Sequence, residues 1–186
     1  MGDPSDAQLM ERVRSGDRDA FAQLVERHKD PLVNYLIRLT GSRDRAEEIA
    51  QEAFLRLFQA AGRYAEQGRL IPFLYRIATN LLRSEERRRR RWRFLAAAFS
   101  SNGDRPEPGP QALLLQAEIQ EKVSAALQAL PTHYRAPLVL REIEGWSYED
   151  IARAMGCREG TVKSRINRGR TQLRETLEPY VSGGRA

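Results

Sequence analysis

Hydrophobic residues recur along this chain with helical spacing. Apolar positions fall three or four residues apart over most of the sequence, and the alternation expected of strands is nearly absent. The pattern predicts an all-α protein built from two small helical domains. We expect helices over residues 5–15, 18–40, 44–61, from 72 into an arginine-rich block, 112–130 and 132–143, followed by two more before the C-terminus. Asp30-Pro31 is expected to interrupt the second of these and bend its axis, because proline removes a backbone donor.

The composition changes sharply after the arginine-rich block. Residues 100–110 contain three prolines and two glycines but no large apolar side chain. Such a stretch cannot bury enough surface to offset the entropy lost on ordering. The sequence therefore predicts a first domain over 1–97, a flexible linker over 98–112 and a second domain over 113–182, with the linker mobile in the free protein.

The segment after Trp146 has the pattern of a helix-turn-helix. Ser147 and Asp150 have the spacing of a capping box, and Gly156-Cys157 supply a turn. On the helix that follows, Val162, Ile166, Gly169 and Leu173 share one face. The opposite face carries Ser164, Asn167, Arg168 and Thr171, flanked by Lys163 and Arg174. One apolar stripe and one polar, cationic stripe are what a helix in the major groove needs, and their combination with the cap and turn favours DNA binding over a merely solvated basic face.

Charge is concentrated in two places. The net charge is +6, yet residues 83–93 hold seven Arg against two Glu, and residues 158–174 hold six Lys or Arg against one Glu. These two blocks indicate an anionic partner. The single cysteine, Cys157, allows no internal disulfide, and the two histidines make a zinc site or a histidine-based triad implausible. We expect no catalytic residues, no metal and no cofactor, and the lack of a signal peptide or apolar span points to the cytoplasm.

The helices expected in the first domain carry two further surfaces. In the third, Leu55 lies among outward polar residues, and helical geometry alone does not separate an ordinary exposed Leu from a protein-binding patch. In the fourth, Phe73 and Tyr75 border a polar face. Rings beside cations suit single-stranded nucleic acid, although for either ring alone a place in the core is the favoured interpretation.

Taken together, these segments resemble the extracytoplasmic-function sigma factors of the sigma-70 family over nearly the whole chain. Residues 46–55 are similar to the family's polymerase-docking helix, and residues 73–80 to its promoter-melting segment. Residues 127–131, 145–152 and 160–166 are similar to its second DNA-binding domain. Phe73 stands where the family usually has Trp.

The resemblance implies a transcription initiation factor with contacts to DNA and to polymerase. Contacts to the minus-thirty-five element would come from Lys163, Ser164, Arg165, Asn167, Arg168 and Arg170. Contacts to the minus-ten element during melting would come from Tyr64, Phe73, Tyr75, Arg76, Asn80, Arg83 and Arg87. Polymerase docking would use Glu48, Gln51, Glu52 and Leu55. The implied partners are core RNA polymerase, promoter DNA and an anti-sigma factor, with no small-molecule substrate and no membrane insertion.

Two other functions remain open from the sequence. A one-component helix-turn-helix regulator would use the same motif but needs a ligand or dimerisation domain. A nucleic-acid enzyme would need clustered acids, whereas the acids of this chain are spread along helix faces.

Overall fold

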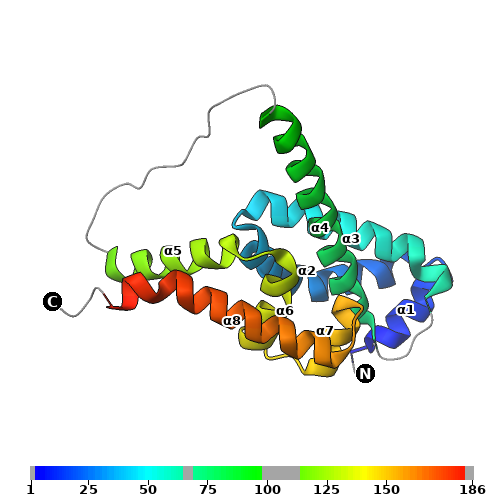
Figure 1. The fold of residues 1–186 in the computed structure, drawn as a ribbon. Coiled ribbons are helices and arrows are strands. Elements are labelled where there is room, and N and C mark those ends of the chain that lie inside the picture. The colour runs from blue at the N-terminus through cyan, green and yellow to red at the C-terminus, as the bar shows by residue number, and fades with distance from the viewer. Residues whose placement is uncertain (1–2, 65–68, 98–113, 183–186) are drawn as a thin grey trace.

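Helices make up all the regular structure in the described part of the chain. The computed structural model describes residues 3–64, 69–97 and 114–182 (Figure 1). The elements are α1 (Asp6–Arg14), α2 (Arg18–Thr40), α3 (Arg43–Ala60), a 3-10 turn η1 (Ala61–Arg63), α4 (Leu70–Ala97), α5 (Leu114–Ala129), α6 (Thr132–Glu142), α7 (Tyr148–Met155) and α8 (Glu159–Ser182). The all-α prediction is confirmed. The segment expected to be a mobile linker, residues 98–112, lies outside the described residues.

Side-chain caps explain why several helices begin where they do. Ser5, Asp17, Ser42 and Ser147 each accept a hydrogen bond from the backbone N–H three residues on. Ser5 and Gln8 complete a reciprocal capping box. At Ser147 the return bond predicted from the sequence is not formed. The carboxylate of Asp150 instead accepts from the Ser147 hydroxyl at 2.6 Å, because Asp is one methylene shorter than the Glu of a full box.

Two helices with a proline differ from the sequence-based expectation. Helix α2 runs without interruption through Pro31, whose side chain is exposed. The packing of α2 on α3 therefore outweighs the loss of one backbone hydrogen bond. Helix α4 begins at Leu70, two residues before Pro72, so the proline still lies in the first turn, where its missing N–H has no partner to lose.

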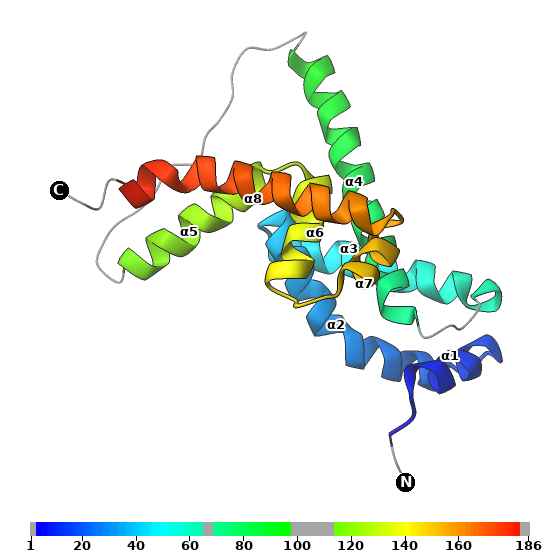
Figure 2. The same ribbon diagram turned by 60° about the horizontal axis from the view of Figure 1, so that its bottom comes forward.

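The molecule has two helical regions that meet along one contact. Helices α1–α4 form the first region and α5–α8 the second, and in both views the later part of α4 projects beyond the body (Figures 1 and 2). Helix α4 packs against α7, and α2 packs against α5 and α6. Buried apolar side chains of both regions form one continuous cluster. We call this inter-region contact the seam.

The polar centre of the seam is Arg135 of α6, which is 4% exposed. Its Nη2 lies 2.7 Å from Oε1 of Glu86 on α4, and its Nη1 lies 2.7 Å from Oε1 of Gln128 on α5. The hydroxyl of Thr132 donates to the other carboxylate oxygen of Glu86. A second ion pair joins Arg38 of α2 to Glu144 at 3.0 Å. Glu86, Gln128 and Thr132 thus supply hydrogen-bond partners for both terminal nitrogens of the buried Arg135 guanidinium, which offsets part of its desolvation.

The apolar side of the seam is a row of three aromatic rings. Tyr75 lies between Tyr35 of its own region and Trp146 of the other, with ring centroids 4.9 Å and 4.7 Å away. Tyr75 is only 4% exposed. Burial first, and then the carboxylate of Glu144, raise the pKa of Tyr75 above its ordinary value. Both causes depend on residues of the second region.

Loss of the carboxylate of Glu86 should weaken the packed state. We expect Glu86→Ala to lower the free energy of unfolding by roughly 2 kcal/mol, less than for a fully buried pair because the side chain of Glu86 is 33% exposed. The matched control is Glu47→Ala, which breaks the exposed pair with Arg43 and should cost about 0.5 kcal/mol or less. Urea denaturation followed by circular dichroism measures both. Equal losses would show that the pair at Arg135 contributes no more than a surface pair.

Removal of the ring of Trp146 should change the titration of Tyr75. A raised folded pKa means that neutral Tyr75 stabilises the packed state below its unfolded pKa of roughly 10, and that this contribution is lost as pH rises through the folded pKa. In Trp146→Ala we expect one fewer tyrosine to resist ionisation, measured by tyrosinate absorbance during alkaline titration. Tyr35, whose hydroxyl bonds Thr79 within the first region, is expected to remain resistant. An unchanged number would contradict the ring contact.

Candidate nucleic-acid interface

Helices α7 and α8 form the predicted helix-turn-helix. Gly156 ends α7 with a φ of +61°, a left-handed conformation that favours glycine. Val162 and Ile166 of α8 are fully buried. Gly169 allows a close approach to α6, since a Cβ there would lie 3.4 Å from the carbonyl oxygen of Tyr134. The packing face of α8 expected from the sequence is therefore confirmed.

The outward face of α8 is polar and cationic. Lys163, Ser164, Asn167 and Arg168 are exposed, and none of them forms an ion pair with a described residue. Two other residues predicted to contact DNA already have partners within the protein. Nη1 of Arg165 donates to Sγ of Cys157 at 3.6 Å, and Arg170 pairs with Glu142 at 2.6 Å. The exposed members of the predicted DNA-binding set without an ion pair to a described residue thus lie in the second and third turns of α8.

The predicted minus-ten residues divide between the surface and the core. Asn80 and Arg87 are exposed, and Arg83 is half-buried. Arg76 is also exposed, and its guanidinium lies against the turn of the helix-turn-helix, because a Cβ at Gly156 would be 3.2 Å from it.

The aromatic members of the set lie deeper. Phe73 and Tyr64 are half-buried and contact each other, with ring centroids 5.3 Å apart. Tyr75 is buried in the seam. In this structure Tyr75 therefore completes the core, which is the interpretation favoured for a single ring from the sequence.

The predicted polymerase-docking residues form one exposed patch on α3. Glu48 and Gln51 are exposed, Leu55 is 50% exposed, and Glu52 pairs with Arg56 along the helix at 2.7 Å. The patch borders a groove of about 470 Å³ between α2 and α3. Its lining includes Phe21, Val25, Val33, Phe54 and Leu55. Leu55 is therefore not an isolated exposed side chain, because it borders an apolar groove. Of the two interpretations that the sequence left open, this favours the protein-binding patch.

A second apolar groove escaped the sequence analysis. It has a volume of about 450 Å³ and lies among α5, α6 and α8. Leu127, Leu138, Ile143, Leu173 and Leu177 are among its lining residues, and Ile143 is 47% exposed. Each of these residues fits the apolar stripe of its own helix. Only the packing of three helices shows that together they leave a groove.

Two classes of site have no candidate in the described part of the chain. No group of His, Cys, Asp and Glu there could hold a metal ion. Among the same residues no helix has the length and apolar character needed to cross a membrane.

Comparison with known proteins identifies both regions. Residues 24–93 match the family model for sigma-70 region 2, and residues 120–173 match the model for sigma-70 region 4. The RNA polymerase sigma-H factor of Pseudomonas aeruginosa is 36% identical over 184 residues, covering 95% of each chain. The ECF RNA polymerase sigma-E factor of Escherichia coli is 33% identical over 185 residues, covering 95% of this chain and 96% of that one.

A solved structure shows a similar arrangement. The sigma factor RpoE of Bartonella quintana, determined in complex with the anti-sigma factor NepR, superposes with a TM-score of 0.66 and 26% identity. The match covers 85% of this chain and 96% of that one. With the helix-turn-helix and the two matched regions in place, the chain belongs to the sigma-70 family and is an extracytoplasmic-function sigma factor, a protein without enzymatic activity that directs RNA polymerase to promoters.

Proposed function

We propose that this sigma factor divides promoter recognition between α8 and α4 and docks on polymerase through α3. The observation that carries the proposal is the exposed face of α8, where Lys163, Ser164, Asn167 and Arg168 stand opposite the buried Val162 and Ile166. In this division residues 1–97 form the docking and melting domain and 113–182 the upstream-binding domain. Its place of action is then the cytoplasm, where chromosomal DNA and polymerase meet.

Helix α8 is suited to double-stranded DNA. The major groove presents a distinct pattern of donors, acceptors and methyl groups for each base pair, so a helix can read it without strand separation. Asn167 and Arg168 have side chains that reach base edges, while Lys163 can neutralise a phosphate. These residues are assigned to the minus-thirty-five element, together with Arg165 and Arg170.

Helix α4 is suited to a strand that is separating from its partner. Arg76, Asn80, Arg83 and Arg87 project from one side of α4, and Phe73 lies at its margin. Arginines can hold phosphates while rings stack on unpaired bases. We assign these residues, with Tyr64 and Tyr75, to the minus-ten element during melting. Use of Tyr75 in this role requires that Trp146 move off its ring.

The α3 patch and its groove are suited to a protein partner. Leu55 supplies an apolar contact beside the groove, and Glu48, Gln51 and Glu52 give its rim a polar, acidic character. A hydrophobic centre with a polar rim is the usual anatomy of a protein interface. We assign this patch to core polymerase.

An anti-sigma factor is proposed as a further partner. The related RpoE of Bartonella quintana is bound by such a protein. This chain retains apolar grooves on both regions, between α2 and α3 and among α5, α6 and α8, which an inhibitory partner could cover.

The function as a whole is tested by transcription with purified core polymerase. The chain should confer initiation from specific promoters without any other sigma factor present. A helix-turn-helix regulator would change transcription only when another sigma factor is already bound.

Changes in the α3 patch should weaken polymerase binding without unfolding the chain. Glu52→Lys and Leu55→Asp place a reversed or buried charge in the contact, which typically costs about 2 to 5 kcal/mol of binding. Glu11→Lys, a charge reversal at an exposed position of α1, is the control. Pull-down with core polymerase measures binding, and circular dichroism checks the fold. If both patch variants bind as the control does, the patch is wrongly assigned.

Separate substitutions in α8 and α4 should impair separate steps. Arg168→Ala should lose roughly 1 to 3 kcal/mol at the upstream element, while DNA that remains bound melts normally. Arg14→Ala, which removes an exposed arginine from α1, is its control. Asn80→Ala combined with Arg83→Ala should spare upstream binding and impair melting. Footprinting of the upstream element and permanganate reactivity of downstream thymines, both with holoenzyme, measure the two steps. Normal upstream binding by the Arg168 variant, or normal melting by the double variant, would refute this division.

A further inference from the structure

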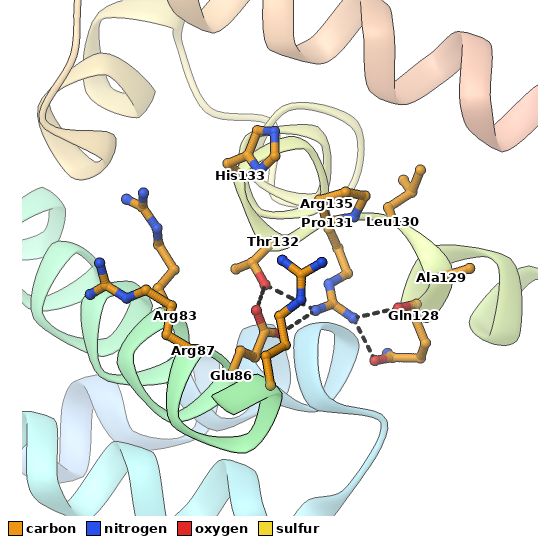
Figure 3. Close-up of a pocket in the computed structure, with 11 residues that line it drawn as sticks. Arg83, Glu86, Arg87, Gln128, Ala129, Leu130, Pro131, Thr132, His133 and Arg135 are labelled. Atoms are coloured by element: carbon orange, nitrogen blue, oxygen red, sulfur yellow. Dashed lines mark hydrogen bonds and ion pairs between the residues drawn. The ribbon is translucent and has the colours of Figure 1, made fainter. Parts of the chain in front are cut away.

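A strongly basic cavity lies at the seam between α4 and α6. It has a volume of about 480 Å³, which is within the range of small-ligand pockets. Its α4 wall carries Arg83, Glu86, Arg87 and Arg90, and Arg135 comes from α6. Figure 3 shows Arg83 and Arg87 on the α4 side, with Arg135 held between the two regions. Four Arg against one Glu give these walls a formal charge of +3.

The one acid of the cavity is already engaged. Both carboxylate oxygens of Glu86 are taken, by Arg135 and by Thr132. Arg83 and Arg90 form no hydrogen bond or ion pair with any described residue, and Arg87 bonds only the hydroxyl of Ser84. The nearby Arg89, by contrast, pairs with Glu85 at 3.0 Å. Within the described part of the chain, Arg83, Arg87 and Arg90 therefore have no negatively charged partner.

The opposite wall contains the beginning of α6. Leu130, Pro131, Thr132 and His133 line it, and the capping position, Pro131, offers no side-chain acceptor to the first turn. Free backbone N–H groups and the helix dipole make such an end attractive to anions. Burial, followed by the positive charges of Arg165 and Arg83, lowers the pKa of His133. Only the smaller, electrostatic part of this shift reports the positive charge around the cavity.

An unsatisfied group within the cavity wall provides a separate indication. Nε of Arg135 is buried and has no hydrogen-bond partner, although the residue is only 4% exposed and its other two nitrogens are fully engaged. A buried donor without an acceptor is unfavourable, and more so when the group is charged. Because Nε is shielded from solvent, it adds positive charge to this wall of the cavity and no direct contact to a ligand.

From this convergence we propose that the seam cavity binds a small phosphate-bearing anion that bridges the two regions. Phosphate oxygens match the arginine forks and the backbone donors of α6. The walls come from both regions, so the cavity exists only while the seam is closed, and the ligand stabilises that closed state by mass action. The phosphates of a DNA backbone would also suit the arginines on the open face of α4. The cavity itself is closed on its other side by α6, so it fits a compact ligand.

The consequence for transcription rests on the proposed function. Arg83 and Arg87 are among the residues assigned to the minus-ten element, and the bound anion occupies both. It therefore competes with promoter DNA for these side chains. It also holds Trp146 over Tyr75. The ligand acts as an inhibitor of promoter opening and is not a substrate.

The test is titration calorimetry of the full chain with inorganic triphosphate at constant ionic strength. We expect saturable binding of one triphosphate per chain. Arg87→Ala combined with Arg90→Ala should weaken it by at least about tenfold, because two charge-assisted contacts are lost. Arg88→Ala combined with Arg89→Ala removes the same charge from the same helix outside the cavity, and should change the affinity less than about twofold. Equal losses in the two double variants would reduce the effect to general electrostatic attraction and overturn the proposal.

A second titration distinguishes a free anion from nucleic acid. A short single-stranded oligonucleotide is added to the preformed complex. It should displace triphosphate only when the concentration of oligonucleotide phosphate groups is well above the concentration of triphosphate phosphate groups. The contrary outcome has two parts. Triphosphate does not bind the unmodified chain, and the oligonucleotide binds that chain but binds Arg87→Ala/Arg90→Ala more weakly. In that case the cavity is a nucleic-acid contact and the proposal is wrong. Both measurements use the isolated chain. A negative result in either does not bear on the proposed function, which is tested separately by promoter-specific transcription with core polymerase.

Discussion

The closed arrangement depends on the requirement that a buried guanidinium have hydrogen-bond partners. Arg135 cannot lose its proton, and its burial is tolerable only where acceptors surround it. Gln128 and Thr132 come from its own region, but the charge is balanced by Glu86 from the other. The contact of Tyr75 with Trp146 and the ion pair of Arg38 with Glu144 flank this centre. The seam therefore joins the two regions through a specific set of partners, whereas an apolar contact alone would tolerate many alignments.

The partners of Arg135 also determine a free energy that promoter binding must supply, because the two regions have to separate. Elements named for positions minus ten and minus thirty-five lie roughly 25 base pairs apart, or roughly 85 Å along the duplex. In the closed state Arg76 of α4 touches the turn before α8, so α4 and α8 cannot serve both elements at once as proposed. Opening exposes Arg135 and separates Tyr75 from Trp146. Polymerase and DNA must therefore bind the open state more tightly than the closed one by at least the free energy of the seam.

The sequence predicted the local structure well because local structure depends on short spacings. Apolar periodicity located each helix within a few residues, and it identified both faces of α8, including the buried Val162 and Ile166. The errors occurred where tertiary packing outweighs local preference. Pro31 does not interrupt α2, and Asp150 is too short to return the backbone bond at Ser147. Long-range features had no sequence signal, since Glu86 and Arg135 are 49 positions apart and neither belongs to a recognisable motif. The apolar groove among α5, α6 and α8 was missed for the same reason.

The two acids within the arginine-rich block of α4 explain how one helix can have structural and binding roles. Glu85 faces α3, where it pairs with Arg45 at 3.2 Å, and Glu86 faces α6, where it pairs with Arg135 at 2.7 Å. Consecutive helical residues point about 100° apart, so adjacent acids can anchor α4 to two different neighbours. With its acids used for packing, α4 leaves Arg83 and Arg90 without an ion-pair or hydrogen-bond partner among the described residues. The positive charge of the block is thus available to an external anion because its negative charge is committed to the fold.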